Sequence, residues 1–521
     1  MHHAGKQTDS AMIGTTPISP SPASSPKPRG ISREMTQDEA ETIIEAFGSA
    51  AKRAKQVGFD AVEIHGASGY LLGQFLSPHT NQRTDQFGGD LEGRARFPLG
   101  VVQRIRERVG SDFVVGYRLA AEEFIEDGLH LAESLQFVEM LGEFDIDYIH
   151  ATAGVVYETG EWIAPPIYIS PGSLVYIAEA VKKRTKIPVI AVGRINDPYQ
   201  AERILEEGKA DLVAMGRALL ADPCFAQKTR KGKGDEIIRC VACNHCANRV
   251  LVEHGEIACA VNPETGREKE FQICISKHPK KVLIVGGGPS GLEAARVLKL
   301  RGHDVKLFEE KDYLGGNLVL AAKAPHKEEI LNIIHFYAKQ MEKLEISVYL
   351  NHRMSETEVL ADNPDAVVIA TGSLPTLPDI PGIEDADVLQ ATDVLANESA
   401  MGRKVVIIGG GHVGIETAAW LATQGKEVVV LEVLRRILTD VEPLTRRVLI
   451  QDLKKTTVQW KTSVQVKRIA KGSVRFLDAE ENEHELKTDT ILLACGAVPN
   501  NKLKKMLEGK VDEIYCSGDA V

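Results

Sequence analysis

The sequence predicts an α/β protein: a partial (β/α)8 TIM barrel, a cysteine-rich segment and two similar Rossmann-like units, in that order. Three observations predict it. Short apolar strands alternate with helical patterns between residues 59 and 217, four cysteines crowd residues 240–259, and a glycine-rich strand–turn–helix pattern occurs twice after residue 280. At 521 residues the chain is long enough for about three domains.

The composition is that of an ordinary globular protein and argues against several classes of function. Hydrophobic residues make up 43% of the chain and charged residues 26%. The net charge of −11, from 62 basic and 73 acidic residues, disfavours nucleic acid as a partner. No apolar run reaches the roughly 18–20 residues that a membrane span needs, and the polar start MHHAGKQTDS is unlike a signal peptide. We therefore expect a cytoplasmic protein with a small-molecule partner; the sequence leaves the oligomeric state open.

The start of the chain predicts a loop followed by a helix. The Pro- and Ser-rich stretch from Thr15 to Gly30 is typical of a loop or a disordered tail. Thr36 and Glu39 have the spacing of a capping box, and apolar positions at helical intervals continue to Val57, with Gly58 as the stop.

Five short apolar strands, each followed by a helical pattern, come next. They are DAVEIHG, VVGYRLA, DYIHATAG, IPVIAVGR and ADLVAMGR, and each has a polar residue near its end: His65, Arg118, His150, Arg194 and Arg217. Alternating strands and helices predict a parallel sheet, and polar strand ends favour a barrel, whose active site lies there. An eight-stranded barrel needs three more strands. We therefore expect an unusual barrel or a chain truncated at its N-terminus, where MHHAG could be the tail of a further strand.

Two stretches in the second half of the chain carry the same glycine-rich fingerprint. Each has an apolar strand, G-x-G-x-x-G, a helix, a second strand and an acid 18 residues beyond the last glycine. The first copy consists of Gly286, Gly288, Gly291 and Glu309, and the second of Gly409, Gly411, Gly414 and Glu432. The glycines form a tight turn, admit a pyrophosphate and let helix and strand pack closely, while the acid binds a ribose. Two copies predict two dinucleotides: a bound flavin and an exchangeable nicotinamide.

Further segments support this pair of dinucleotide-binding units. VVIATGS around Thr371 and ILLACGAVPN around Gly496 are typical of the strand–turn segments that close such domains. Glu432 favours NADH because a carboxylate repels a 2′-phosphate. Arg435 and Arg436 lie close by in the sequence and could bind such a phosphate, so NADPH stays open as an alternative.

Four of the eight cysteines are candidate metal ligands. Cys240, Cys243, Cys246 and Cys259 have the spacing C-x2-C-x2-C-x12-C. Eight cysteines in a large chain without a signal peptide indicate thiol or metal chemistry rather than disulfides. Three ligands in one short loop with a distant fourth suit a [4Fe–4S] cluster, whereas a zinc ribbon would have two separated C-x2-C pairs. The spacing favours the cluster, with zinc and an unliganded set as alternatives.

The stretch EIHGASGYLLGQFLSPHTNQRTDQFGGDLEGRARF makes a family resemblance specific. It resembles the Old Yellow Enzyme barrel, in the multidomain iron–sulfur flavoprotein branch of the NADH:flavin oxidoreductases. That branch contains 2,4-dienoyl-CoA reductase, enoate reductases, bile-acid-inducible oxidoreductases and trimethylamine dehydrogenase. The resemblance covers essentially the whole chain. It implies that HHAGKQT ends a third barrel strand, that roughly 100 residues precede it, and that the chain stops inside the flavin domain.

The resemblance also implies roles for individual residues. Arg118 would face the pyrimidine end of FMN and stabilise negative charge on the reduced ring. The FMN phosphate would be held by Gly193, Arg194, Gly216 and Arg217. Tyr70 would donate a proton to the substrate α-carbon, and His65 would polarise the substrate carbonyl. In IYCSGDAV, Asp519 would bind the ribityl chain of FAD.

The sequence departs from the family pattern at two positions. Ser68 stands where common members have His or Asn as the second residue of the carbonyl-binding pair. TAGVVYETG offers no histidine where dienoyl-CoA reductases place a catalytic one, and Tyr157 is the nearest candidate. A dienoyl-CoA substrate is therefore unsupported. Purely structural roles stay open for four of the site residues: Tyr70, His65, Arg118 and Arg194.

These predictions divide the chain into five segments. They are a partial TIM-barrel FMN domain (1–235), an iron–sulfur segment (236–278), the first part of an FAD domain (279–395), an NAD(P) domain (396–500) and an incomplete return to the FAD domain (501–521). The predicted function is an oxidoreductase that passes electrons from NAD(P)H through FAD and the cluster to FMN. It would reduce an activated C=C bond of an enoate, enone or enoyl thioester. An amine dehydrogenase of the trimethylamine dehydrogenase type and a catalytically incomplete fragment are the alternatives.

Overall fold

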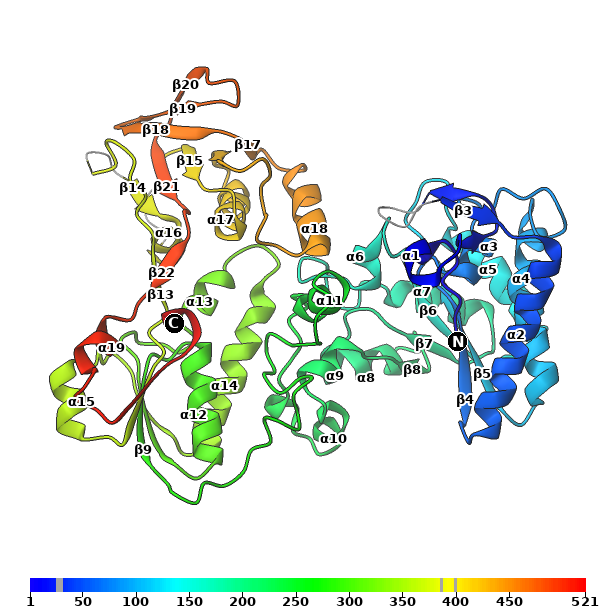
Figure 1. Cartoon of the computed structure of the whole chain (residues 1–521), viewed down its shortest axis with the longest axis horizontal. Helices are drawn as coiled ribbons and strands as arrows, with labels where there is room; N and C mark the ends of the chain where they lie inside the picture. The colour runs from blue at the N-terminus through cyan, green and yellow to red at the C-terminus, as the bar shows by residue number, and fades with distance from the viewer. Residues whose placement is uncertain (25–30, 385–387, 398–400) are drawn as a thin grey trace. The chain divides into compact units, whose positions relative to one another are not determined.

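The protein divides into two compact units, Met1–Ala218 and Leu219–Val521 (Figure 1). The computed structural model describes residues 1–24, 31–384, 388–397 and 401–521. Within those ranges, no helix combines the length and the apolar character that crossing a membrane requires.

The start of the first unit contains a small sheet where the sequence predicted only a loop. β1 (Ile18–Ser19), β2 (Ala23–Ser24) and β3 (Ile31–Glu34) pair in the order β1-β3-β2, after the short helices η1 (Gly5–Gln7) and α1 (Ser10–Ile13). The prediction of a loop from Thr15 to Gly30 is therefore wrong at residues 18–19 and 23–24. Its last part, residues 25–30, lies outside the described residues.

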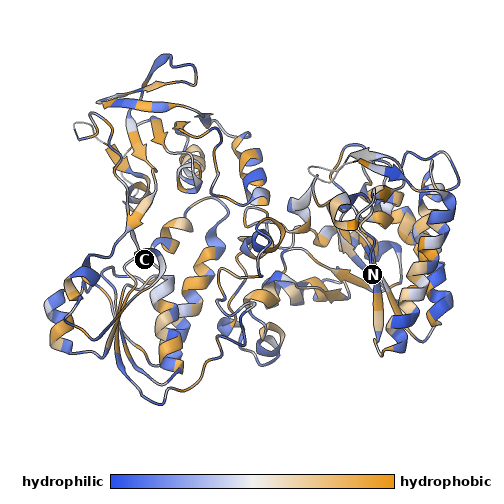
Figure 2. Ribbon diagram, in the orientation of Figure 1, coloured by the Kyte–Doolittle hydropathy of each residue, from blue (hydrophilic) through white to orange (hydrophobic). Residues whose placement is uncertain are grey.

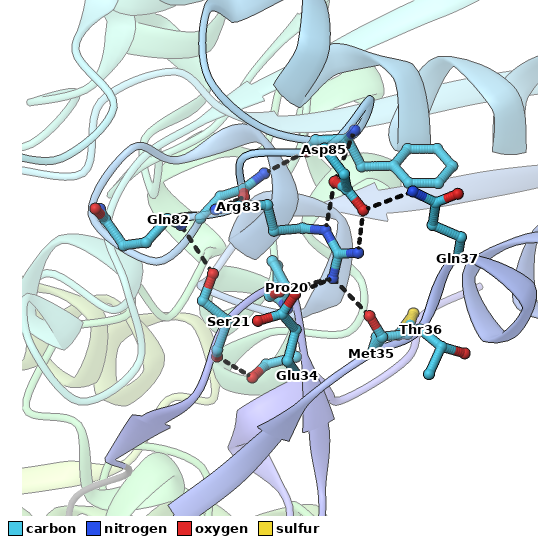
Figure 3. A network of polar contacts seen from close by, with 12 residues as sticks. Pro20, Ser21, Glu34, Met35, Thr36, Gln37, Gln82, Arg83 and Asp85 are labelled. Atoms are coloured by element: carbon cyan, nitrogen blue, oxygen red, sulfur yellow. Dashed lines mark hydrogen bonds and ion pairs between the residues drawn. The ribbon is translucent and has the colours of Figure 1, made fainter.

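A buried arginine holds this small sheet to the segment that follows α3 (Leu71–Leu76). Arg83 Nη1 donates to the carbonyls of Pro20 at 2.9 Å and Met35 at 2.6 Å, and Arg83 Nε donates to Asp85 Oδ1 at 2.9 Å (Figure 3). The Pro and Ser content around Pro20 gives no sign of a hydrogen bond to Arg83, which lies 63 residues further along the chain. That is why the sequence pattern predicted a loop.

The predicted helix and the five predicted strands of the barrel region are confirmed. α2 (Gln37–Gln56) begins with the capping box: Glu39 N donates to Thr36 Oγ1 at 3.1 Å, and Thr36 N donates to Glu39 Oε2 at 2.9 Å. The strands are β4 (Ala61–Gly66), β5 (Val114–Ala120), β6 (Tyr148–Thr152), β7 (Val189–Ala191) and β8 (Leu212–Val213). They form one parallel sheet in sequence order, as a β/α barrel wall requires.

Helices lie between these strands and cover one face of the sheet with apolar side chains. α2 and α4 (Leu91–Val109) pack side by side (Figure 1). The other helices of the unit are α5 (Leu131–Leu141), α6 (Gly160–Ile163), α7 (Val175–Arg184) and α8 (Pro198–Glu206). Ile64, Tyr117 and Ile149 are fully buried in this core. Residues alternate faces along a strand, so the opposite face carries His65, Arg118 and His150.

The second unit contains two parallel sheets in which four matched strands have the same order. The first consists of β9 (Lys281–Val285), β10 (Asp304–Phe308), β11 (Ser347–Tyr349), β12 (Ala366–Ile369) and β23 (Glu513–Cys516), in the order β11-β10-β9-β12-β23. The second consists of β14 (Val388–Gln390), β15 (Lys404–Ile408), β16 (Glu427–Leu431), β17 (Gln459–Lys461) and β21 (Thr490–Leu493), in the order β17-β16-β15-β21-β14. Their central strands are almost entirely hydrophobic (Figure 2). The order β11-β10-β9-β12 matches β17-β16-β15-β21, whereas the edge strands differ: β23 follows the other strands of its sheet in the chain and β14 precedes them. The duplication seen in the sequence is therefore also a duplication of topology over these four strands.

The chain crosses between the two sheets twice. β13 (Ser373–Pro375) leaves the first sheet, β22 (Ala497–Pro499) leaves the second, and the two pair antiparallel. β23 then returns to the first sheet beside β12. A separate antiparallel sheet consists of β18 (Gln465–Ala470), β19 (Ser473–Leu477) and β20 (Glu483–Lys487).

The second unit also contains helices, several of which pack against these sheets. They are α10 (Phe225–Arg230), α11 (His245–Leu251), α12 (Pro289–Leu300), α13 (Asn317–Ala321), α14 (Leu331–Lys343), α15 (Glu356–Asp362), α16 (Ala391–Asn397), α17 (His412–Thr423), α18 (Pro443–Leu453) and α19 (Lys502–Leu507), with the short η2 (Gly234–Glu236), η3 (Glu328–Ile330) and η4 (Gly518–Ala520). α9 (Arg217–Ala221) begins at the end of the first unit.

Candidate functional site

Three polar side chains form one rung across the barrel sheet. His65 on β4 is in register with Arg118 on β5, and Arg118 is in register with His150 on β6. In-register residues of parallel strands point to the same face, so the three side chains lie next to one another near the carboxyl ends of the strands. The sheet therefore brings together residues that are 85 positions apart in the sequence (150 minus 65).

A carboxylate on the rung below organises this group. Glu63 Oε2 lies 3.0 Å from His150 Nδ1, and the Tyr148 hydroxyl also hydrogen-bonds to Glu63. A Cβ at Gly116, between Glu63 and Tyr148 in the register, would lie 2.0 Å from the Tyr148 ring, so glycine is needed there. Burial acts to raise the pKa of Glu63, but the hydrogen bond from His150 and the nearby positive charges outweigh it and lower the pKa.

His65 is adjacent to the predicted proton donor. The ring centroids of His65 and Tyr70 are 5.2 Å apart, and Tyr70 is the N-cap residue of α3. Burial, with the charge of Arg118 adding to it, lowers the pKa of His65 to about 4. His65 is therefore a neutral imidazole at pH 7 and can donate or accept a hydrogen bond without adding charge.

The N-terminal residues contribute to this part of the site. The His2 ring lies 5.0 Å from the Tyr70 ring and 6.0 Å from the His65 ring, measured between centroids. His65 N donates to the carbonyl of Met1 at 2.9 Å, so the first residues run beside β4. Lys6 is buried and its Nζ lies 3.2 Å from Glu158 Oε1, in the segment after β6.

The rung contains two buried nitrogens with no hydrogen-bond partner among the described residues. They are Arg118 Nε and His150 Nε2. A buried polar group without a partner costs about 1–3 kcal/mol, so such groups mark a place where a polar ligand is expected. The carbonyl and ring nitrogens of a flavin pyrimidine supply acceptors of this kind, and the residues present therefore fit FMN.

The residues predicted to hold the FMN phosphate lie after β7 and β8. Arg194 is buried, has a positive φ of 51° and donates from Nη1 to the carbonyl of Ile167 at 2.9 Å. The same nitrogen bonds the carbonyl of Ile169. Arg194 thus also fixes the loop in front of α7. A Cβ at Gly216 would meet nothing within 4 Å, so the backbone just before α9 has open space beside it.

The first nucleotide fingerprint has the geometry that its glycines predict. A Cβ at Gly286 would lie 2.2 Å from the carbonyl oxygen of Ala370, and one at Gly291 would lie 1.9 Å from that of Gly286. At Gly288 a Cβ would meet nothing within 4 Å, so this backbone is open for a pyrophosphate. Glu309 is buried at the end of β10, where its Oε2 accepts from Gly287 N at 2.6 Å.

The return strand brings the predicted flavin motif to this fingerprint. Ser517, just after β23, donates from its backbone to the carbonyl of Ile369 at 3.0 Å. Its hydroxyl also hydrogen-bonds to that of Ser290, at the start of α12. Asp519 lies exposed two residues later. The candidate ribityl ligand is therefore close to the helix N-terminus that would face the FAD pyrophosphate.

The second fingerprint repeats this construction. Cβ atoms at Gly409 and Gly414 would lie 2.3 Å from the Ala494 oxygen and 2.0 Å from the Gly409 oxygen. Glu432 is buried, and its Oε2 accepts from Gly410 N at 2.6 Å. A cavity of about 440 Å³ opens beside it. The lining includes Gly409, Gly411, Glu432, Val464, Ala494 and Cys495.

The four predicted cluster ligands lie near one another in the second unit. Although the Cys243 side chain reaches solvent, the surrounding protein desolvates its sulfur, and with the charges of Cys240, Cys259 and Cys246 this raises the pKa of Cys243 to about 11. In the described part of the chain no three His, Cys, Asp or Glu side chains are close enough to hold a single ion. A cubane binds each cysteine to a different iron, so its ligands stand further apart than those of one zinc ion.

The loop between Cys240 and Cys246 has an unusual backbone conformation at two residues. Ala242 and Asn244 both have positive φ, 50° and 58°, which non-glycine residues rarely adopt. Asn244 is buried, and its Nδ2 donates to Glu442 Oε1 at 3.3 Å. Together with Cys259 further along the chain, the thiols of this loop supply the donor chemistry that a [4Fe–4S] cluster requires.

Residues 1–236 match the NADH:flavin oxidoreductase / NADH oxidase family, and residues 280–515 match the pyridine nucleotide-disulphide oxidoreductase family. The NADH oxidase of Thermoanaerobacter brockii is 40% identical over the whole chain, which covers 81% of that protein. The chain belongs to the NADH:flavin oxidoreductase / NADH oxidase family. It is an oxidoreductase of the multidomain branch of that family, so the resemblance found in the sequence is confirmed.

Other members of the family are named for two kinds of chemistry. The cinnamate reductase of Clostridium sporogenes is 35% identical and covers 99% of this chain and 80% of its own. A solved complex of 2-naphthoyl-CoA reductase with 2-naphthoyl-CoA is 34% identical, with a TM-score of 0.96 over all of this chain and 81% of the other. The N,N-dimethylglycine/sarcosine dehydrogenase of Chromohalobacter salexigens is 36% identical over 80% of this chain and 62% of its own.

Sequence reasoning missed Glu63, His2 and Lys6, and one of them had a usable signal. Glu63 is two residues before His65 in a strand, so the period of two already places both on one face. His2 and Lys6 had no such signal, because their contacts join the chain start to β4, α3 and the loop after β6.

Ser68, which departs from the family pattern, is buried with a positive φ of 60°, and its carbonyl accepts from Val156 N at 3.2 Å.

Proposed function

We propose that this oxidoreductase uses NADH to reduce an activated C=C bond, as in an enoate, enone or enoyl thioester. The observation that carries the proposal is the pairing of Tyr70 with a neutral His65 beside the Arg118 cation, at the carboxyl end of the barrel strands. A hydride acceptor of this type needs a donor for its carbonyl and a proton for its α-carbon. The names of the cinnamate and 2-naphthoyl-CoA reductases support this class of substrate.

Four redox groups would serve this chemistry, and the chain has candidate residues for each. FMN would be held by Arg118, Gly193, Arg194, Gly216 and Arg217; FAD by Gly286, Gly288, Gly291, Glu309 and Asp519; NADH by Gly409, Gly411, Gly414 and Glu432; the cluster by Cys240, Cys243, Cys246 and Cys259. When bound, they supply two-electron chemistry at NADH and substrate and one-electron transfer between the two flavins.

The protein's own groups would set charge and protons around the substrate. Arg118 would hold FMN and would supply a positive charge that stabilises the reduced form of the flavin. His65, being neutral, donates a hydrogen bond to the substrate carbonyl without repelling Arg118. Tyr70 donates its phenolic proton to the α-carbon of the substrate. Glu63 orients the His150 ring through its contact with His150 Nδ1.

NADH is the preferred reductant in this proposal. The carboxylate of Glu432 is fixed at the end of β16 by backbone donors, Gly410 N at 2.6 Å and Leu434 N at 2.7 Å. In that position it accepts from a ribose diol and repels a 2′-phosphate. Arg435 and Arg436 are exposed to solvent, so they do not neutralise the buried carboxylate of Glu432.

Replacing Tyr70 with phenylalanine tests the proton donor. With cinnamate and NADH under anaerobic conditions, Tyr70→Phe should lower kcat for C=C reduction by roughly 10²–10⁴-fold, because one general acid is removed. The rate at which NADH bleaches the flavin absorbance should not change. If Tyr70→Phe reduces the C=C bond at the wild-type rate, Tyr70 is not the proton donor. A wild-type protein that oxidises NADH but reduces no enone, enoate or enoyl thioester would sink the proposed substrate class.

Oxidation of a methylated amine is the second candidate, supported by the dimethylglycine/sarcosine dehydrogenase relative. Electrons would then leave the substrate at FMN. The two proposals differ in which compound bleaches the bound flavins anaerobically. NADH alone should do so for the reductase, and dimethylglycine or sarcosine alone for the dehydrogenase.

A further inference from the structure

The two nucleotide fingerprints differ at the amino end of the helix that would receive the pyrophosphate. In the first copy a Cβ at Gly288 would meet nothing within 4 Å. In the second copy a Cβ at Gly411 would lie 3.1 Å from Asp440 Oδ2. A carboxylate therefore covers the second glycine of the second fingerprint, at the position where the backbone should be open.

This carboxylate is bound to the helix itself. His412 N, the first backbone donor of α17, donates to Asp440 Oδ1 at 3.1 Å and to Asp440 Oδ2 at 3.0 Å. A negative group at a helix amino end is stabilised by the unsatisfied N–H groups and the helix dipole. Those are the interactions that a dinucleotide pyrophosphate would use, so Asp440 and the pyrophosphate compete for the same donor and repel each other.

The first copy has neither the backbone donor nor the carboxylate acceptor of this contact. In the matched alignment of the two fingerprints, Pro289 stands where the second copy has His412, and proline has no N–H to donate. Asn317 stands where the second copy has Asp440, and it is a neutral residue.

The segment that carries Asp440 is held in place at its start. Leu438 N donates to the Gly410 carbonyl at 2.8 Å, as Gly315 N does to the Gly287 carbonyl in the first copy. Leu438 is fully buried and has a positive φ of 55°, where the first copy uses glycine. A buried leucine in this conformation is tolerated only when its surroundings fix it. The Asp440 side chain is itself exposed, so it can turn away from His412 into water.

We propose that Asp440 determines the affinity of the second fingerprint for its dinucleotide. Its carboxylate occupies the pyrophosphate position until the ligand displaces it, which weakens binding and keeps the nicotinamide exchangeable. The first fingerprint, with Asn317 at this place, retains its dinucleotide. This inference rests on the proposed use of a nicotinamide dinucleotide at the second fingerprint.

The decisive variant is Asp440→Asn in the FAD-loaded full chain, with binding measured by isothermal titration calorimetry. The amide keeps an acceptor for His412 N but removes the charge. We expect Kd for NAD⁺ and for ADP-ribose to fall about tenfold, equivalent to about 1.4 kcal/mol. Kd for adenosine, which has no pyrophosphate, should stay the same. Unchanged or weaker binding of ADP-ribose would overturn the inference, as would an equal gain for adenosine.

Two further variants complete the test. Asp452→Asn removes the same charge near the far end of α18, where Asp452 pairs with Lys455 at 2.8 Å, and should leave every Kd unchanged. Asn317→Asp places the carboxylate in the first copy and should increase loss of FAD on dilution; unchanged FAD retention counts against the inference. If neither wild type nor Asp440→Asn binds NAD⁺ or ADP-ribose, the nicotinamide function fails together with the inference. Wild-type binding with no response to Asp440→Asn overturns the inference alone.

Discussion

At the residue scale, the pKa of His65 makes a prediction about stability. Folding lowers this pKa from 6.5 to about 4, through burial first and the charge of Arg118 second. The folded protein therefore binds this proton less tightly than the unfolded chain. The stability that His65 contributes is complete above pH 6.5 and is lost as the pH falls through about 4.

Urea unfolding of wild type and His65→Gln at pH 7.5 and pH 5 would measure this contribution. We expect the free energy of unfolding to fall on acidification by more in the wild type than in the variant. Arg118→Met should raise the His65 pKa toward 6.5, because it removes a nearby positive charge. An identical pH dependence in wild type and His65→Gln would contradict the environment described for His65.

Residue-scale reasoning from the sequence was partly sufficient. The strand pattern predicted that His65 and Arg118 would lie at strand ends, and the sheet register adds that they share one face. The strand pattern could not predict that Glu63 binds both His150 and Tyr148, because those hydrogen bonds depend on which strands are neighbours. The roles of Tyr70 and His65 in chemistry stay predictions until the variants are measured.

At the element scale, the later part of the stretch that carries the family resemblance is a scaffold. Within NQRTDQFGGDLEGRARF, Asn81 Nδ2 donates to the carbonyls of Phe75 and Phe87, at 2.6 and 2.8 Å. Arg83 donates to the Met35 carbonyl, next to the small N-terminal sheet, and Arg94 Nε donates to the Leu76 carbonyl at 2.9 Å. These buried side chains hold the segment after α3, whereas His65 and Tyr70 lie in the first part of the same stretch.

The glycines of the first fingerprint allow ligand and fold effects to be separated. Gly288→Ala should leave the melting temperature of the FAD-free protein unchanged, because the added methyl group meets no protein atom within 4 Å. It should weaken FAD binding about tenfold or more, because the methyl group lies where the pyrophosphate approaches. Absorbance of the retained flavin after dilution measures this.

Gly291→Ala is the matched control for that experiment. Its methyl group would lie 1.9 Å from the Gly286 carbonyl oxygen, so it should destabilise the FAD-free protein by about 1–3 kcal/mol. Equal loss of FAD from Gly288→Ala and from wild type would show that no pyrophosphate approaches Gly288.

At the scale of the whole molecule, the cysteine segment stands between the barrel family match and the nucleotide-binding family match. Anaerobic reconstitution with iron and sulfide should load about four iron and four sulfide per chain. Cys243→Ser should lower that content and the visible absorbance, while Cys274→Ser, an exposed cysteine outside the set, should not. One zinc per chain with no sulfide would contradict the cluster.

The sequence by itself determined the order of domains, the two fingerprints and the α/β class. Each of these depends on short-range patterns: the periods of strands and helices, glycine spacing and cysteine spacing. Only the tertiary structure decided which side chains meet. It placed His65, Arg118 and His150 on one rung, tied Pro20 to Arg83, and laid Asp440 over Gly411. The physical reason is that these contacts depend on sheet register and on hydrogen bonds between residues far apart in the chain, which no local pattern specifies.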